Sequence, residues 1–445
     1  MKNADTGKIG LLASSTILIG GMFGSAIFSL SGLTITIAGP SAMLSWVIAA
    51  AILFLYGLIS AELSTIYPDS GVVYMFPAKS LGKSPGSGRL WGWISGWAYI
   101  FGCFGGASFS ASYIGIYLGV TFPAMSGWQI PVAIGVILVC GLLNASGVKA
   151  AGRASTIMAA GLITAMVAFI IAGLFSGSWD AGNMRPFFPA GAGSLSFMSA
   201  VPLAMVAYSS VVAVSFMVGE IRNPKKTVPL AMTIAMIVVV SMYLLIMLTT
   251  LGLVTAEYLL DTGMQYVPLY AAAYRSLTNL PWVPYVISAA AVLALANNIM
   301  VLGALLIRTL QAMASSGLLP QVLTKQSRLG ATPPAAVAVV VIVMSLLASI
   351  PNATNFIIGM GTLCSAIVVV LICMSVLAAR KKNPEASRFK APGGNVMPIA
   401  LMLVIVACYI PNILAGGWQI WACSAAYFAV GLGVYRLRKG KTRAH

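Results

Sequence analysis

Twelve long apolar segments constrain the fold of this chain more than any other feature of its sequence. A helix needs about 20 consecutive apolar residues to cross the roughly 30 Å hydrocarbon core of a bilayer. Only 7% of the residues are charged, against about 25% in a soluble domain. We therefore predict an all-α polytopic membrane protein with twelve transmembrane helices. The predicted spans are 10–34, 40–63, 90–118, 128–147, 154–175, 195–219, 227–254, 282–310, 333–350, 354–379, 395–414 and 417–435.

The placement of Lys and Arg predicts the orientation of these spans. Cytoplasmic loops of membrane proteins are rich in both residues. With twelve spans the two termini share one side, and that side collects all but two of the 25 Lys and Arg residues. The exceptions are Arg185 and Arg275. The net charge of +17 thus indicates cytoplasmic loops and not a nucleic-acid partner. We expect a multi-pass protein of a bacterial inner membrane with both termini in the cytoplasm.

The sequence predicts neither a signal peptide nor a cofactor. Met1–Gly10 contains Lys2 and Lys8 but has no short apolar core followed by a cleavage site, as a signal peptide would. The cysteines lie in apolar segments without paired spacing, which favours small buried thiols over disulfides or metal ligands. They are Cys103, Cys140, Cys364, Cys373, Cys408 and Cys423.

The first span contains a glycine-rich stretch that is a poor helix interior. Gly20, Gly21 and Gly24 occur within five residues and are followed by Ser25 and Ala26. Each glycine costs about 1 kcal/mol relative to alanine in a helix. A helix broken inside a bilayer must expose its unpaired backbone to protein or to a cavity. The stretch is therefore a candidate ligand site, although the same glycines would also let another helix pack closely.

The sixth span occupies the matching place if the chain consists of two five-helix halves. It contains Ala207–Ala213, with Pro202 upstream and no central glycine, so a break is less obvious there. Its adjacent Ser209 and Ser210 are able to bind a ligand or the backbone of the preceding turn.

Four stretches carry patterns that are shared with a known family. They are Gly20–Phe28, Ala61–Gly71 after the second span, Gly219–Pro229 after the sixth with its E-x-x-N-P-x-x-x-x-P pattern, and Ala314–Pro320 after the eighth. Together they resemble the amino acid–polyamine–organocation (APC) superfamily, and the resemblance runs from about Gly10 to the last span.

This resemblance implies a five-plus-five inverted repeat (LeuT-like) with broken helices 1 and 6 and two accessory helices. The implied parts are a cytoplasmic tail at 1–9, a first repeat at 10–175, a second repeat at 195–379, accessory helices 11 and 12 at 395–435, and a basic tail at 436–445. Three departures from the family pattern concern substrate and coupling: Val72-Val73 after the first loop motif, Ser210 and Val212 at the helix 6 break, and the absence of a basic residue from 155–164.

No Asp, Glu, His, Lys or Arg lies near the middle of a predicted span. An intramembrane enzyme would need such groups, and a cation channel would usually show acidic rings or a carbonyl filter. We therefore expect a secondary transporter, with a receptor-like sensor as a rival that only transport assays would separate. A dicationic substrate would leave its second charge unpaired, so a neutral or zwitterionic amino acid fits better. A cationic amino acid or polyamine antiporter is the alternative, and proton coupling, sodium coupling and pure exchange stay open.

The candidate residues follow from this reading. A substrate carboxylate would bind N–H groups near Gly24, Ser25 and Ala26, and its ammonium would bind carbonyls near Ile19 to Gly21 and around Tyr208 to Ser210. Asn297 and Asn298 in the eighth span are candidates for the pocket wall, or for hydrogen bonds between helices. The candidate gate residues are Phe23, Glu62 and Glu220. The expected partners are a small amino acid or amine and the lipid bilayer, with a second copy of the chain as a further candidate.

Overall fold

The computed structural model describes residues 9–67, 72–82, 84–189, 195–326, 332–350, 354–382, 389–415 and 417–442. Most of the predicted N-terminal tail and the last residues of the basic tail therefore lie outside the described residues. The described part of the chain is all-helical apart from one isolated bridge, in which Ile9 pairs with Ile221.

The first predicted span consists of two helices separated by three residues. Helix α1 covers Leu11–Met22 and α2 covers Ala26–Ala38, so the chain leaves the helix at Phe23-Gly24-Ser25. The sixth predicted span is also interrupted: α8 (Ser196–Val206) ends in a turn at 207–208, and the 3₁₀ helix η4 (Ser209–Glu220) follows. Both interruptions lie inside long apolar segments, where a regular helix would otherwise pair every backbone group.

Each of the other predicted spans coincides with one helix. These helices are α3 (Ala42–Ile66), α5 (Pro85–Thr121), α6 (Gln129–Ala145), α7 (Val148–Leu174), α9 (Pro224–Leu253), α12 (Val283–Ser315), α13 (Pro334–Ala348), α14 (Thr354–Lys382), α15 (Val396–Ala415) and α16 (Gly417–Thr442). Among the described residues, eight helical stretches are long and apolar enough to cross a membrane. Four shorter apolar helices accompany them: Leu11–Met22, Ser196–Val206, Pro334–Ala348 and Val396–Tyr409. The chain is therefore a multi-pass membrane protein.

Short helices occupy the connections. They are η1 (Gly39–Ser41), α4 (Val72–Ser80), η2 (Pro123–Trp128), η3 (Ala181–Met184), α10 (Ala256–Asp261), η5 (Met264–Tyr266), α11 (Pro268–Ser276) and η6 (Gln321–Thr324). Helix α5 begins five residues before the predicted start at 90, because Ser84 and Ser87 form a capping box and Pro85 occupies the first helical position.

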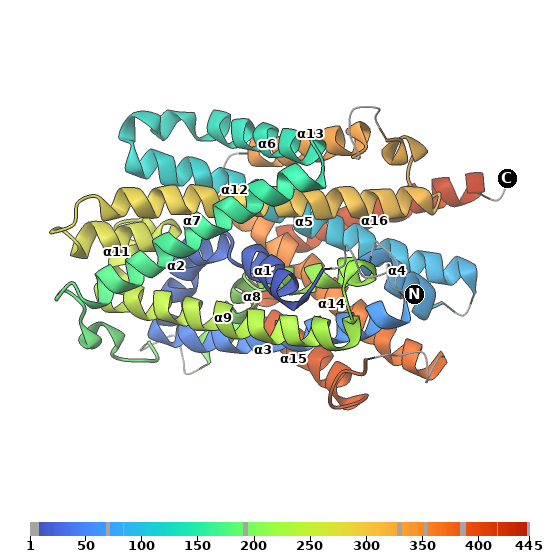
Figure 1. Cartoon of the computed structure of the whole chain (residues 1–445), viewed down its shortest axis with the longest axis horizontal. Coiled ribbons are helices and arrows are strands. Elements are labelled where there is room, and N and C mark those ends of the chain that lie inside the picture. The colour runs from blue at the N-terminus through green and yellow to red at the C-terminus, as the bar shows by residue number, and fades with distance from the viewer. Residues whose placement is uncertain are drawn as a thin grey trace.

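The long helices run roughly side by side along the long axis of the molecule, and the short helices α1 and α8 lie among them (Figure 1). Helix α5 packs against α6, α12 and α14, whereas α3 packs against α8 and α9. The interrupted segments pack against these continuous helices, α1 against α9 and α8 against α3, so the continuous helices form a scaffold for the break.

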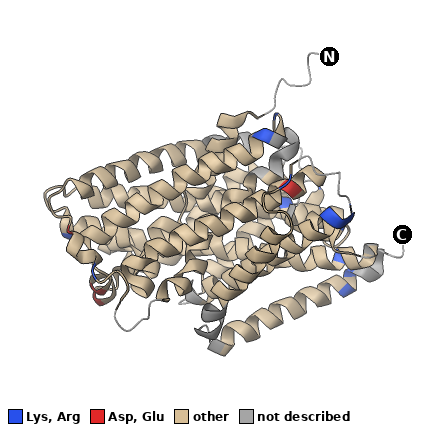
Figure 2. Ribbon diagram, turned by 90° about the horizontal axis from the view of Figure 1, so that it is seen from below, with Lys and Arg blue, Asp and Glu red and all other residues tan. Residues whose placement is uncertain are grey.

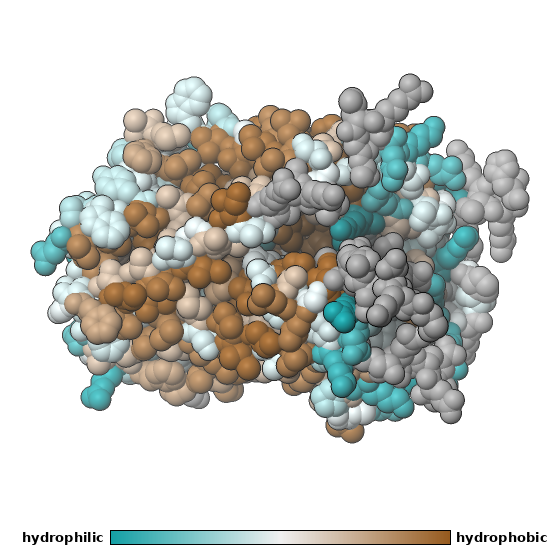
Figure 3. All heavy atoms as spheres, in the orientation of Figure 1, coloured by the Kyte–Doolittle hydropathy of each residue, from teal (hydrophilic) through white to brown (hydrophobic). Residues whose placement is uncertain are grey.

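Charge and hydropathy are distributed as in a membrane protein. Lys and Arg gather at the end of the molecule where both termini lie (Figure 2). A broad apolar surface crosses the middle of the molecule, and hydrophilic residues lie at its two ends (Figure 3). The side chains of Leu142, Ile157 and Leu346 are exposed and apolar, as is expected where lipid covers a membrane protein.

Candidate substrate site

A cavity of about 150 Å³ lies where the two interrupted segments meet the scaffold. Its walls come from the α1–α2 break, from α8 and the start of η4, and from α3, α5, α12, α14 and α15. Its described lining contains no charged side chain. The polar residues in that lining are Ser25, Tyr56, Tyr99, Cys103, Ser209, Ser210, Asn298, Thr362, Ser365 and Tyr409.

The end of α1 offers one carbonyl to this cavity. The Phe23 N–H donates to the Ile19 carbonyl at 2.8 Å, Asn297 Nδ2 donates to the Gly20 carbonyl at 3.1 Å, and the Tyr243 hydroxyl donates to the Met22 carbonyl. The carbonyl of Gly21 accepts no hydrogen bond from the described part of the chain, and Gly21 lines the cavity. A helix C-terminus carries partial negative charge, so this carbonyl is suited to an ammonium group.

The start of α2 offers N–H groups. The N–H groups of Phe28 and Ser29 both bond to the Ser25 carbonyl at 3.1 Å. Those of Ala26 and Ile27 precede the first bond within the helix and have no carbonyl of α2 to use. Ser25 is buried, and its side chain does not cap the helix. Positive partial charge at a helix N-terminus favours a carboxylate, and Ser25 and Ala26 line the cavity.

The turn after α8 contributes a second carbonyl. The Ala207 N–H bonds to the Ala204 carbonyl and the Tyr208 N–H to the Met205 carbonyl. The Ala207 carbonyl accepts no bond from the described residues, and Ala207 lines the cavity. Pro202, one turn earlier, cannot donate to the helix ladder.

The two serines of this turn differ in what their side chains do. The Ser209 hydroxyl donates back to the Val206 carbonyl at 2.9 Å, which is the local bonding that the sequence left open as an alternative. Ser210 lies directly against the break, because a Cβ built on Gly21 would be 3.3 Å from Ser210 Cβ. Gly21 therefore lets the two interrupted segments approach each other closely.

The adjacent asparagines of α12 point to different surroundings. Asn298 lines the cavity and donates from Nδ2 to Ser110 Oγ at 2.9 Å. Asn297 lies outside the lining, and its amide joins three helices: Nδ2 binds the Gly20 carbonyl, and Oδ1 accepts from Ser155 Oγ at 2.6 Å. The structure thus brings Asn298 to the cavity and gives Asn297 an interhelical role.

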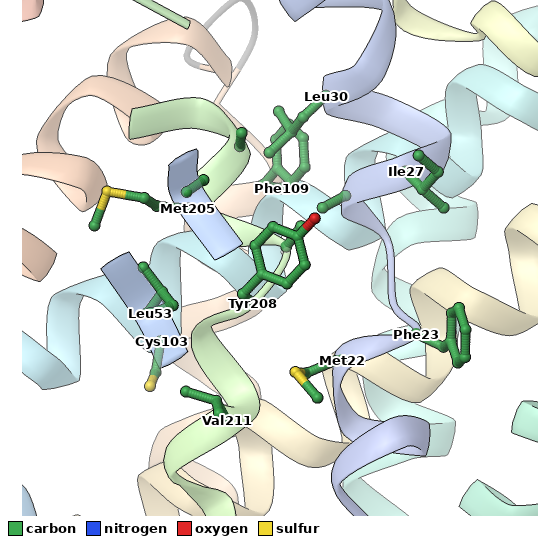
Figure 4. Close-up of a cluster of buried hydrophobic side chains, with 14 of the residues drawn as sticks. Met22, Phe23, Ile27, Leu30, Leu53, Cys103, Phe109, Met205, Tyr208 and Val211 are labelled. Carbon is green, nitrogen blue, oxygen red and sulfur yellow. The ribbon is translucent and has the colours of Figure 1, made fainter. Parts of the chain in front are cut away.

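Phe23 and Tyr208 lie in an aromatic cluster behind the break and are absent from the cavity lining. Both side chains are fully buried, and both contact Tyr243, with ring centroids 5.7 Å and 5.6 Å away. In Figure 4 the Tyr208 ring is seen on the side of the α1–α2 connection, whereas the Met205 and Val211 side chains point away from that connection. Ile19 is half-buried in α1 and does not line the cavity.

Neither acidic candidate is among the described residues that line the cavity. Glu62 near the end of α3 forms an ion pair with Arg380 at 2.6 Å. Arg380 belongs to α14, which continues three residues beyond the predicted span. Glu220 is the last residue of η4, and its side chain lies outside the described residues.

Several residues of the site were not found from the sequence. Tyr243 binds the Met22 carbonyl at the break, Ser110 binds Asn298, and Ser155 binds Asn297. Each contributes a single hydroxyl from an apolar helix, and the sequence contains no signal that distinguishes it. The glycines of α5 mainly permit packing. A Cβ on Gly105 would lie 3.0 Å from Ile357 Cγ2, and one on Gly106 would lie 3.0 Å from Leu302 Cδ1.

Comparison with known proteins identifies the family. The model of a family described as "Amino acid permease" matches residues 9–434. The chain is 28% identical to the branched-chain amino acid permease BcaP of Bacillus subtilis over 98% of this chain and 93% of that protein. It is 28% identical to the serine/threonine exchanger SteT of the same organism over 58% of this chain and 57% of SteT. The chain is 28% identical to the human cationic amino acid transporter 4 over 83% of this chain and 59% of that protein. The uncharged cavity at the helix break thus lies in a chain that belongs to the amino acid permease family.

Proposed function

We propose that this protein is a secondary active transporter that moves a neutral amino acid across the membrane by alternating access. The twelve predicted spans form two five-helix repeats, 10–175 and 195–379, followed by the accessory helices of 395–435. The substrate binds at the breaks between α1 and α2 and between α8 and η4. The observation that carries the proposal is the uncharged lining of a cavity bordered by two interrupted helices.

The unpaired backbone groups of the cavity match the two charged groups of a zwitterion. The carboxylate binds the N–H group of Ala26 at the start of α2, together with the Ser25 hydroxyl. The ammonium binds the carbonyls of Gly21 and Ala207. Both ends are thus neutralised by helix-end partial charges, and no ionised side chain is needed.

The remaining lining suits a small to medium, uncharged side chain. An apolar cavity of about 150 Å³ holds a molecule of the size of benzene. A second cationic group in this lining would find no carboxylate, and an unpaired charge at this depth is costly. The names of BcaP and SteT, which specify branched-chain amino acids, serine and threonine, agree with this choice.

Counterflow into proteoliposomes tests the proposal. Purified protein is reconstituted with unlabelled amino acid inside, and labelled leucine, serine, arginine and putrescine are added outside, with and without a pH gradient. We expect uptake of leucine or serine that depends on internal substrate. Uptake confined to arginine or putrescine would show that the cavity holds a cation without a carboxylate. That result would favour the cationic alternative, which the human relative's name also suggests.

The membrane orientation and the gates belong to the same proposal. Both termini face the cytoplasm of a bacterial inner membrane, since the Lys- and Arg-rich end of the molecule contains them. Glu62 stabilises the closed cytoplasmic side through Arg380, and Glu220 lies on the same side. Phe23 acts from the aromatic cluster behind the break. The gating role is tested by the rate of counterflow in the Glu62 variants described below.

A further inference from the structure

One side chain binds the last carbonyl of α1, and it comes from a helix that no sequence motif connects with the site. Tyr243 of α9 is fully buried, and its hydroxyl donates a hydrogen bond to the Met22 carbonyl. The same side chain interacts with the backbone of Gly24. A single hydroxyl therefore contacts the backbone on both sides of Phe23, where α1 ends.

The ring that carries this hydroxyl is held on three sides. Its centroid lies 5.7 Å from the ring of Phe23, 5.1 Å from that of Trp46 and 5.6 Å from that of Tyr208, all in edge-to-face arrangements. Such arrangements are favourable for aromatic pairs. Trp46 is itself fixed, because its Nε1 donates to Thr34 Oγ1 at 3.0 Å. The position of the Tyr243 hydroxyl is thus set by α2, α3 and the turn after α8.

This contact decides which carbonyl stays available at the break. The carbonyls of Gly20 and Met22, on either side of Gly21, are bound by Asn297 and Tyr243. The carbonyl of Gly21, a residue of the cavity lining, lies between them and accepts no hydrogen bond from the described residues. An unpaired carbonyl at membrane depth is costly, so its exposure to the cavity is useful when a ligand ammonium binds there.

We propose that Tyr243 is a positioning residue of the substrate site. Its hydroxyl fixes the backbone from Met22 to Gly24, and so keeps the Gly21 carbonyl and the first N–H groups of α2 at the spacing of the ammonium and carboxylate of one α-amino acid. The inference rests on the proposed function for the place of the substrate. It concerns recognition of the groups on the α-carbon and therefore predicts the selectivity for L over D isomers.

The test compares two substitutions that remove the same chemical group. Tyr243→Phe keeps the ring and removes the hydroxyl at the break. Tyr117→Phe is the matched control, since the Tyr117 hydroxyl donates to the Phe28 carbonyl of α2 at 2.6 Å and is also buried. Each variant loses one buried bond from a tyrosine to a carbonyl of the interrupted segment, so we expect similar small losses of thermal stability.

Counterflow is measured with the L and D forms of leucine, serine and arginine. For Tyr243→Phe we expect the KM of the transported L isomer to rise about tenfold, the effect of one lost hydrogen bond, and the ratio of L to D uptake to fall about fivefold or more. Tyr117→Phe should keep the wild-type ratio. In hydrogen exchange without any amino acid, a peptide covering residues 18–27 should exchange faster in Tyr243→Phe than in Tyr117→Phe.

The two proposals fail in different ways. If the wild-type protein takes up arginine alone, the proposal of a neutral substrate is wrong. The ratio of L-arginine to D-arginine uptake would still test the role of Tyr243. An unchanged L to D ratio in Tyr243→Phe, or equal exchange of the 18–27 peptide in the two variants, would overturn the positioning role. The exchange measurement gives this answer even if none of the three amino acids is transported.

Discussion

Arg380 binds Glu62 through two parallel hydrogen bonds, from Nε to Oε1 at 2.8 Å and from Nη2 to Oε2 at 2.6 Å. The carboxylate is fully buried and also accepts the N–H of Ala391 at 2.7 Å. Arg380 Nη1 in turn donates to the Gly394 carbonyl. The pair therefore joins the end of α3, the end of α14 and the segment that leads into α15. Bidentate pairs of this kind combine strength with fixed geometry.

Glu62→Ala should lower stability, because it leaves the Arg380 charge partly buried and without its carboxylate. Removal of one partner from a buried pair costs about 3–5 kcal/mol, and Arg380 is 14% exposed, so we expect the low end of that range. Thermal unfolding in detergent measures the loss, and Glu257→Ala on the exposed start of α10 is the control.

The double variant Glu62→Ala/Arg380→Ala should be more stable than Glu62→Ala, since it no longer contains an unpaired charge. Strictly additive losses in the two single variants and the double variant would show that the pair is not coupled. In counterflow we expect Glu62→Ala to exchange substrate at a changed rate with little change in KM, because the residue lies outside the cavity lining.

Asn298→Ala and Asn297→Ala should have different effects although the residues are adjacent. Asn298 lines the cavity and binds Ser110, so its loss should change the relative uptake of leucine and serine by several-fold while the protein stays folded. Asn297 joins α1, α7 and α12, so its loss should reduce stability by about 1–3 kcal/mol and lower uptake of all substrates alike. A substrate panel and a melting curve for each variant separate the two outcomes. Identical profiles for both variants would contradict the assignment.

This pair also illustrates what the sequence could predict. Apolar length located the long helices but not the short connecting ones. The glycines of the first span located its interruption, because Gly is unfavourable inside a helix. The interruption after α8 has no glycine, and it was expected from its matching position and from the family resemblance. Successive residues of a helix point about 100° apart, so the sequence identified both asparagines but had no means to tell which one faces the cavity.

The missed residues act over long distances in the sequence. Tyr243 binds a carbonyl of residue 22, and Arg380 binds Glu62, far earlier in the chain. In an apolar helix a single tyrosine has the same local pattern whether it packs, faces lipid or binds backbone. A lone sequence encodes such partners only through the fold as a whole, which is why the break was predicted and the side chain that holds it was not.

Cys103→Phe should shift the substrate preference toward small amino acids. Cys103 is buried in the cavity wall formed by α5, and a phenyl ring there would fill much of a volume of about 150 Å³. We expect leucine uptake to fall at least tenfold relative to serine or alanine uptake, whereas Cys103→Ala should keep the wild-type ratio. Cys423→Phe, at an exposed cysteine, is the control for the bulk of the new side chain. An unchanged ratio of leucine to serine uptake in Cys103→Phe would show that the α5 wall of the cavity does not contact the substrate side chain.

Gly24→Trp and Ser25→Trp should abolish transport with little loss of folded protein. Both residues line the cavity, and a Cβ on Gly24 would lie 3.6 Å from Asn298 Oδ1. An indole at either position would occupy the space between the Gly21 carbonyl and the first N–H groups of α2, and so block the substrate. The matched control is Gly135→Trp in α6, where a built Cβ meets no atom within 4 Å. Counterflow and size-exclusion profiles measure function and folding separately. We expect less than a tenth of wild-type uptake for the two break variants and full uptake for Gly135→Trp. Substantial uptake by Gly24→Trp or Ser25→Trp would show that the substrate binds elsewhere in the protein. The α1–α2 break would then not be the binding site.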